Sequence, residues 1–229
     1  PVAAVVLVLI QGGLGGARVL LDDTTVAKVH ACTGPLFFAV AVALAALTRQ
    51  TGSVMLPRVA AGLAAAVPIA AYAQLVAGAQ LRHLDPATPP RIFHLLVGTH
   101  VLGAIVVALI VAAVAVMTRG TTNLRARRWA LVLTAAVVGQ LLLGGGTWVA
   151  KYGMPSAVLP DGWRLSAPIV ARSGWGAATV TTHAVLGMLI LGGGVALAIA
   201  AAGPAGSASE ANSPLIARGS FRRHTGVPA

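Results

Sequence analysis

The sequence predicts an all-α integral membrane protein, built as a helical bundle of repeated hairpins. Hydrophobic residues make up 57% of its 229 residues and charged residues only 9%, and the mean hydropathy is +0.87. The apolar residues form runs long enough to cross a hydrocarbon core, for which about 20 helical residues suffice. Three of these runs carry a histidine near the same end, namely His30, His100 and His183.

Five apolar runs have the length of complete membrane spans. They are expected at Val29–Leu47, Val59–Ala79, Ile92–Met117, Trp129–Val149 and Gly176–Ala202. Pro1–Ile10 is interpreted as the outer end of part of a sixth span, because the sequence opens without a methionine and without a charged segment. The chain is therefore expected to be a fragment of a longer protein.

The net charge of +11 does not indicate a nucleic-acid partner, because the charges fall in the loops and in the tail. One set of alternate loops, with the tail, holds nine basic residues and one acidic residue, whereas the other set holds seven basic and four acidic residues. An excess of Lys and Arg marks the cytoplasmic side of a membrane, and Arg125–Arg128 is its clearest anchor. The three histidines are then expected at the outer ends of their helices.

The remaining features outside the spans indicate no chemistry of their own. Residues 203–229 are rich in Gly, Ala, Ser and Pro without apolar periodicity, which predicts a disordered cytoplasmic tail. Cys32 is the only cysteine, so no internal disulfide can form, and its apolar surroundings predict a small buried side chain.

A polar pattern recurs in three places, each at the outer end of an apolar run. The pattern Q-x-x-x-G-[GA] begins at Gln11, Gln74 and Gln140. Each copy is followed by an outer loop and then by a run with a histidine. His30 and His183 both begin the sequence H-A-x-x-G, and His100 begins a version that is one residue shorter. The repeated unit is therefore a helical hairpin, present at least three times.

The histidines are the candidate ligands of this repeat. An imidazole at lipid depth is costly unless something uses it, and histidines facing inward from two packed helices commonly hold a metal or a haem iron. A lone histidine could instead bond to a carbonyl group as a structural residue, but three at corresponding places favour ligation. The glutamines can orient a histidine or bond across helices, although packing alone is the more common role of such a motif.

His94 makes the second hairpin ambiguous. It lies six residues before His100, about 600° around a helix, so the two side chains point in substantially different directions. His100 is favoured because it lies deeper and shares a preceding threonine with His183; His94 is the alternative ligand. His83 and His224 have no apolar context, and both are expected to be solvated.

Two longer stretches resemble the heme A synthase family. They are Gln11–Val19, with His30 and Phe37-Phe38 after it, and Gln140–Val149, with His183 after it. The resemblance implies eight membrane helices in two similar four-helix halves in the complete protein. It implies that residues 1–50 are the end of the first half, as a partial third helix and a fourth helix, and that residues 51–202 are the second, haem-binding half.

The resemblance also implies an activity and the roles of the histidines. His100 and His183 would be the axial ligands of a haem b cofactor, and His30 would bind the iron of the substrate haem. The enzyme would be an oxidoreductase that converts the C8 methyl of haem O to the formyl of haem A for cytochrome oxidase assembly. Haem O synthase or assembly factors are the expected partners, the electron acceptor is unknown, and the bacterial plasma membrane is the expected location.

Some residues depart from the family pattern. Val101 follows His100 where many members have arginine, and the outer loops lack cysteine pairs. The family's catalytic glutamate would lie before Pro1, so the catalytic residue is unknown.

Five arginines on the side of the histidines have two interpretations, pairing with haem propionates or contact with lipid head groups. These residues are Arg18, Arg82, Arg91, Arg164 and Arg172.

Two other functions compete with the enzyme. A non-enzymatic di-haem b-type cytochrome that carries electrons would use the same histidines. A transporter with histidines in a proton path would be expected to carry carboxylates within its spans, and the predicted spans contain none.

Overall fold

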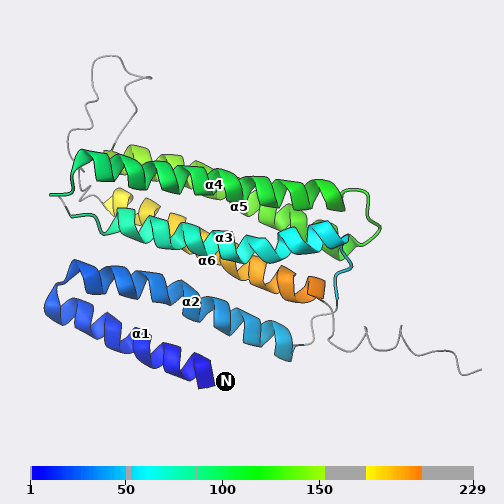
Figure 1. The fold of residues 1–229 in the computed structure, drawn as a ribbon, viewed down its shortest axis with the longest axis horizontal. Helices are drawn as coiled ribbons and strands as arrows, with labels where there is room; N and C mark the ends of the chain where they lie inside the picture. The colour runs from blue at the N-terminus through cyan, green and yellow to red at the C-terminus, as the bar shows by residue number, and fades with distance from the viewer. Residues whose placement is uncertain (1, 50–52, 86, 153–173, 203–229) are drawn as a thin grey trace, which may run out of the picture.

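The computed structural model describes residues 2–49, 53–85, 87–152 and 174–202, which form six α-helices and no strand. Consecutive helices run antiparallel to one another, with their axes roughly along one direction (Figure 1). Their bounds are α1 Val2–Leu21, α2 Thr24–Thr48, α3 Arg58–Arg82, α4 Pro90–Thr118, α5 Leu124–Tyr152 and α6 Gly174–Ala202. All six are long and apolar enough to cross a membrane, which confirms the all-α membrane bundle.

The five complete spans predicted from the sequence lie inside α2 to α6. Helix α1 is longer than the expected segment Pro1–Ile10, because it continues to Leu21 and reaches 20 residues. The glycine-rich stretch after Gln11 stays helical, and one of its glycines, Gly15, lies against the ring of His30 of α2. The described residues therefore hold six membrane-length helices in place of five and a part.

Short polar segments end one helix and begin the next. Asp22 has a positive φ of 47°, and the Asp23 carboxylate accepts hydrogen bonds from the backbone N–H groups of Thr25 and Val26 at 2.7 and 2.9 Å. These bonds lower the pKa of Asp23, because they stabilise its charged form. Two residues are thus enough to turn the chain from α1 into α2.

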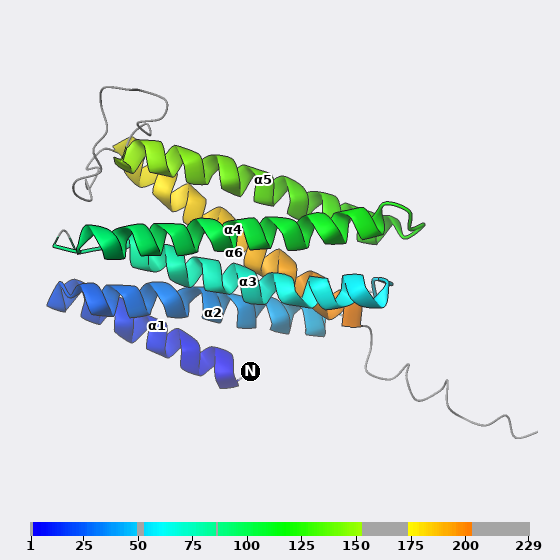
Figure 2. The ribbon, with the colours of Figure 1, turned by 45° about the horizontal axis from the view of Figure 1, so that its top comes forward.

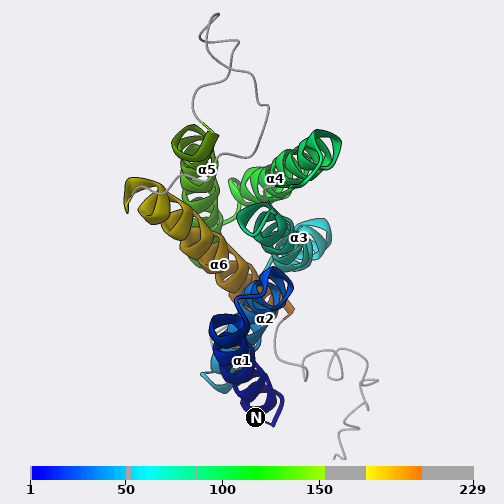
Figure 3. The same cartoon turned by 90° about the vertical axis from the view of Figure 1, so that its left-hand side faces the viewer.

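Helices α3 to α6 form a four-helix ring, which we call the α3–α6 bundle. Each of these helices contacts the next, and α6 closes the ring on α3 (Figure 2). In the described residues α4 and α6 have no close backbone contact, so they lie diagonally across the bundle. The α1–α2 hairpin lies outside it and is attached through α2 to α3 and α6, as the end view shows (Figure 3).

Helix α6 is held closely by three neighbours through consecutive glycines, Gly192–Gly194. A Cβ atom at these three positions would lie 2.8 Å from Phe38 of α2, 3.1 Å from Leu133 of α5 and 2.8 Å from Val67 of α3. Small residues allow membrane helices to approach in this way.

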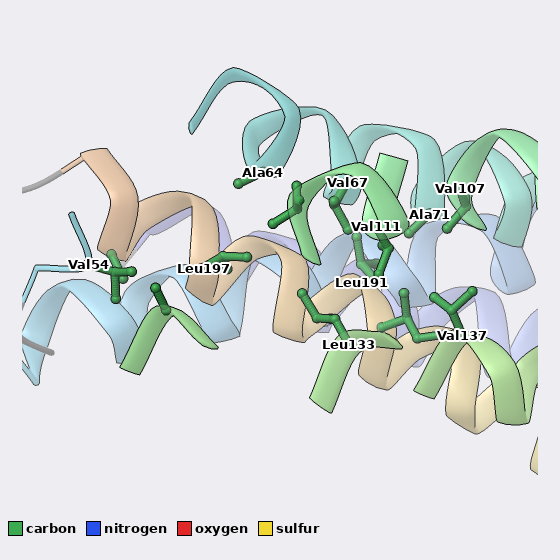
Figure 4. Packing of buried hydrophobic residues seen from close by; sticks show 14 residues of the cluster. Val54, Ala64, Val67, Ala71, Val107, Val111, Leu133, Val137, Leu191 and Leu197 are labelled. Carbon is green, nitrogen blue, oxygen red and sulfur yellow. The ribbon is translucent and has the colours of Figure 1, made fainter. Parts of the chain in front are cut away.

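The apolar core fills the inner part of the α3–α6 bundle (Figure 4). On α4 it begins at Val107 and on α6 at Ile190, in each case about two turns after the histidine. Its residues on the four helices include Ala64, Val67, Ala71, Val107, Val111, Val114, Leu133, Val137, Ile190, Leu191 and Leu197. At the far end Val54 N–H donates to the Ala200 carbonyl at 2.8 Å, and this bond satisfies a backbone acceptor at the end of α6. The histidines therefore lie just beyond the core, toward the end of the bundle that holds the α3–α4 turn.

Candidate functional site

His100 and His183 face each other between α4 and α6, just beyond the apolar core of the α3–α6 bundle. Their ring centroids are 6.3 Å apart, and the ring planes are at 72°. Because α4 and α6 lie diagonally, the two imidazoles face each other between helices whose backbones have no close contact in the described residues. Two imidazoles on opposite sides of one metal ion, with metal–nitrogen bonds of about 2 Å, have ring centres roughly 6 Å apart. The separation fits that arrangement.

Each imidazole rests on a glycine of the preceding helix. The Cε1 atom of His100 lies 3.3 Å from the position of a Cβ on Gly78, and the Cε1 atom of His183 lies 3.3 Å from the position of a Cβ on Gly144. These are the glycines of the pattern Q-x-x-x-G. The sequence repeat is therefore also a repeat of side-chain contacts, in which α3 supports the histidine of α4 and α5 supports that of α6.

The glutamines make the opposite contact. The Gln74 amide occupies the place next to Gly103 of α4, and the Gln140 amide nitrogen lies 3.1 Å from the position of a Cβ on Gly187 of α6. The Gln140 Nε2 atom is also 3.5 Å from the His183 Nε2 atom. Helix–helix packing, as the sequence indicated, is one role of these glutamines, and Gln140 in addition reaches the imidazole.

The α1–α2 hairpin has the same construction. The Cε1 atom of His30 lies 3.4 Å from the position of a Cβ on Gly15. The side-chain amide oxygen of Gln11 lies 3.7 Å from the position of a Cβ on Gly34. The Gln11 amide donates to the Thr33 hydroxyl. His30 is separate from the His100–His183 pair, because α2 lies outside the α3–α6 bundle.

The three histidines share an unmatched polar atom. The Nδ1 atoms of His30, His100 and His183 are buried, and none has a hydrogen-bond partner in the described part of the chain. A buried polar atom without a partner costs about 1–3 kcal/mol. Each of these Nδ1 atoms lies 3.9 Å from the Cβ position of the supporting glycine, so this cost is part of the contact between the imidazole and the glycine.

The donor set of the site is a pair of imidazoles. Among the described residues, no group of three or more His, Cys, Asp or Glu side chains could hold a metal ion. A pair of imidazoles is the axial ligand set that haem iron needs, since the macrocycle supplies the other ligands. The residues present at His100 and His183 therefore fit a haem.

The structure separates the two histidines that the sequence left as alternatives. His94 is exposed, and its ring lies 5.7 Å from that of Phe93, whereas the ring of His100 lies against that of His183. Phe93 also stacks on Trp148 of α5 at 6.5 Å. His94 thus lies on the outer surface of α4, away from the histidine pair.

His83 differs from its prediction as a solvated residue, because it is half-buried at the end of α3. Burial lowers the pKa of His83, and the nearby cations lower it further. These cations are Arg82, Arg18, Lys28 and Lys151. The Lys151 ammonium donates to the Leu81 carbonyl at 2.9 Å, which joins α5 to α3. The two residues are 70 positions apart in the sequence, so no local pattern indicates this contact.

Other predicted residues lie apart from the histidine pair. Cys32 is partly buried, and its carbonyl accepts a hydrogen bond from the Tyr72 hydroxyl at 3.3 Å, so it belongs to the contact between α2 and α3. Arg18, Arg82 and Arg91 are exposed at the ends of their helices. Arg164, Arg172, His224 and the predicted tail, 203–229, lie outside the described residues.

Comparison of the chain with protein-family models, with curated proteins and with solved structures finds no match. The chemistry assigned to the site therefore depends on the geometry of its own residues.

Proposed function

We propose that the chain is a membrane haem protein in which His100 and His183 are the axial ligands of one haem b. The observation that carries this proposal is the pair of imidazoles 6.3 Å apart across the diagonal of the bundle. Each of them rests on a glycine of the preceding helix.

Haem bound at this pair would supply one-electron redox chemistry. The protein's part would be to hold the haem between His100 and His183. A haem iron bound by two imidazoles would favour electron transfer over the binding of small ligands. The apolar core on the inner side of the pair limits the access of water from that direction.

The finer proposal is a heme A synthase-like enzyme that oxidises the C8 methyl of haem O to the formyl group of haem A. It is supported by the resemblance of the two glutamine-containing stretches and by the common construction of the three hairpins. His30 would serve the substrate haem, apart from the haem b of the α3–α6 bundle. We also propose that the histidine end faces the outside of a bacterial plasma membrane and that the C-terminus is cytoplasmic, because the Arg-rich loops lie at the opposite end.

Optical spectra of the purified full-length chain test the haem b site. The reduced-minus-oxidised spectrum of the wild type should show a low-spin b-type haem. His100→Ala and His183→Ala should each lose most of this signal, because the iron keeps one axial ligand. His94→Ala is the matched control and should leave the signal unchanged. Loss of the signal in His94→Ala with retention in His100→Ala would refute the assignment.

The enzymatic proposal needs a separate experiment. Cells supplied with haem O and the full-length protein should accumulate a haem whose pyridine hemochrome is red-shifted by the conjugated formyl group. His30→Ala should reduce this product while the haem b spectrum of the α3–α6 bundle remains. The two effects should separate because His30 and the His100–His183 pair belong to different parts of the fold.

A di-haem b-type cytochrome that carries electrons is the second candidate. The described parts of α1 to α6 hold no carboxylate within the helices, so no acid beside the histidines is available there to move a proton. A wild-type protein that binds haem and never yields formyl haem would support the electron carrier and refute the enzyme.

A further inference from the structure

The three hairpins share an interlock in which each polar side chain occupies a gap left by a glycine on the opposite helix. The histidine of the second helix lies on a glycine of the first, and the glutamine of the first lies on a glycine of the second. The glycine pairs are Gly15 and Gly34, Gly78 and Gly103, and Gly144 and Gly187. We propose that Gly78 and Gly144 are positioning residues that fix where the imidazoles of His100 and His183 lie.

Spacing along the helices makes the interlock sensitive to register. Gln74 and Gly78 are four residues apart on α3, and His100 and Gly103 are three apart on α4, so each pair lies on one face of its helix. Sliding one helix past the other would break the histidine contact and the glutamine contact together. The two contacts therefore fix the height of the imidazole along the bundle.

Both rings share the contact with the glycine, and neither is held by a hydrogen bond at Nδ1; the Gln140 amide in addition lies 3.5 Å from the His183 Nε2 atom. The buried Nδ1 atoms of His100 and His183 have no partner in the described helices, whereas both Cε1 atoms lie 3.3 Å from the Cβ position of the supporting glycine. Carbon atoms in optimal contact are about 3.5–4.0 Å apart. An alanine at either glycine would therefore displace the ring by a few tenths of an ångström.

The chain supplies matched controls for this substitution. Gly145 follows Gly144 in sequence, and a Cβ there would meet nothing within 4 Å; the same holds for Gly98 of α4. Gly144→Ala and Gly145→Ala change the same helix by the same methyl group. They differ in whether that methyl group meets the imidazole.

The first test needs no haem. In the full-length protein with labelled histidine, a nuclear Overhauser effect should link the His183 Hε1 proton to the Gly144 Hα protons. Gly144→Ala should shift the His183 Cε1–H resonance, and Gly145→Ala should leave it in place. Gly78→Ala should shift the His100 resonance in the same way, with Gly98→Ala as its control. Equal resonances in Gly144→Ala and Gly145→Ala, or no Overhauser effect in the wild type, would overturn the proposal.

The second test uses the protein loaded with haem b, and this part rests on the proposed function. Gly144→Ala should weaken haem retention by about tenfold, as changes to residues that orient metal ligands do, and it should shift the midpoint potential, whereas Gly145→Ala should change neither. Unchanged retention and potential in Gly144→Ala would overturn the positioning role at the haem. If the wild type shows the Overhauser effect but binds no haem, the positioning of the ring stands and the proposed function fails.

Discussion

The close approach of α6 to α3 predicts the effect of one added methyl group. In Gly194→Ala the new Cβ would lie 2.8 Å from Val67 Cγ1, 3.1 Å from the Pro68 backbone nitrogen and 3.2 Å from Pro68 Cδ. Carbon contacts are optimal at about 3.5–4.0 Å, so the overlap with Val67 is roughly 1 Å. The proline ring and its backbone cannot rotate away, and α6 must therefore move from α3.

Two terms of opposite sign set the magnitude. Alanine is a better helix former than glycine by about 1 kcal/mol, and overpacking in a close-packed interior costs about 1–3 kcal/mol. Gly62→Ala on α3 isolates the first term, because a Cβ at Gly62 meets nothing within 4 Å. The difference between the two variants is then the packing cost alone, about 1–3 kcal/mol.

Thermal unfolding in detergent, followed by far-UV circular dichroism, measures this difference. For a chain of this size about 1 kcal/mol corresponds to roughly 2–4 °C. The midpoint of Gly194→Ala should therefore lie roughly 2–12 °C below that of Gly62→Ala. A midpoint for Gly194→Ala equal to or above that of Gly62→Ala would refute the close contact between α6 and α3.

Three further predictions concern other contacts. Burial and four cations lower the pKa of His83 from 6.5, so neutral His83 stabilises the fold above the unfolded pKa, and this stability is lost as pH falls through the folded pKa. His83→Gln should therefore show a smaller fall in unfolding midpoint below pH 6.5 than the wild type. An equal fall in both proteins would contradict this. Asn123 accepts hydrogen bonds from two backbone N–H groups at the start of α5, each at 3.1 Å, so Asn123→Ala should cost about 0.5–2 kcal/mol by chemical unfolding, while Asn123→Asp should not. In Gly103→Ala the new methyl group takes the place of the Gln74 amide, so the Overhauser effects between α3 and α4 should weaken, in contrast to Gly98→Ala.

The sequence predicts the helices well because membrane length and apolar composition are properties of single segments. It also predicts the hairpin repeat, since Gln11, Gln74 and Gln140 recur at the same place in each unit. The sequence favours His100 over His94 because His100 lies deeper and shares a preceding threonine with His183. The structure places the His100 ring 6.3 Å from that of His183, and the role of either histidine as a ligand stays a prediction.

Other features depend on contacts between helices, which no local pattern encodes. The polar loop predicts a solvated His83, but the ends of α1, α2 and α5 bring cations to it. Pairing of the α4 and α6 histidines across a diagonal also depends on the way in which four helices close into a ring. The division at residue 50 and the haem roles remain predictions, since no contact described here tests them.

The central claim is that His100 and His183 bind the same iron atom. Low-temperature electron paramagnetic resonance of the oxidised, haem-loaded full-length chain tests it most directly, because the spin state of ferric haem reports both axial ligands. The account predicts a low-spin signal in the wild type and in His94→Ala, and a high-spin signal in both His100→Ala and His183→Ala. A low-spin signal that survives in either of the last two variants would contradict the claim.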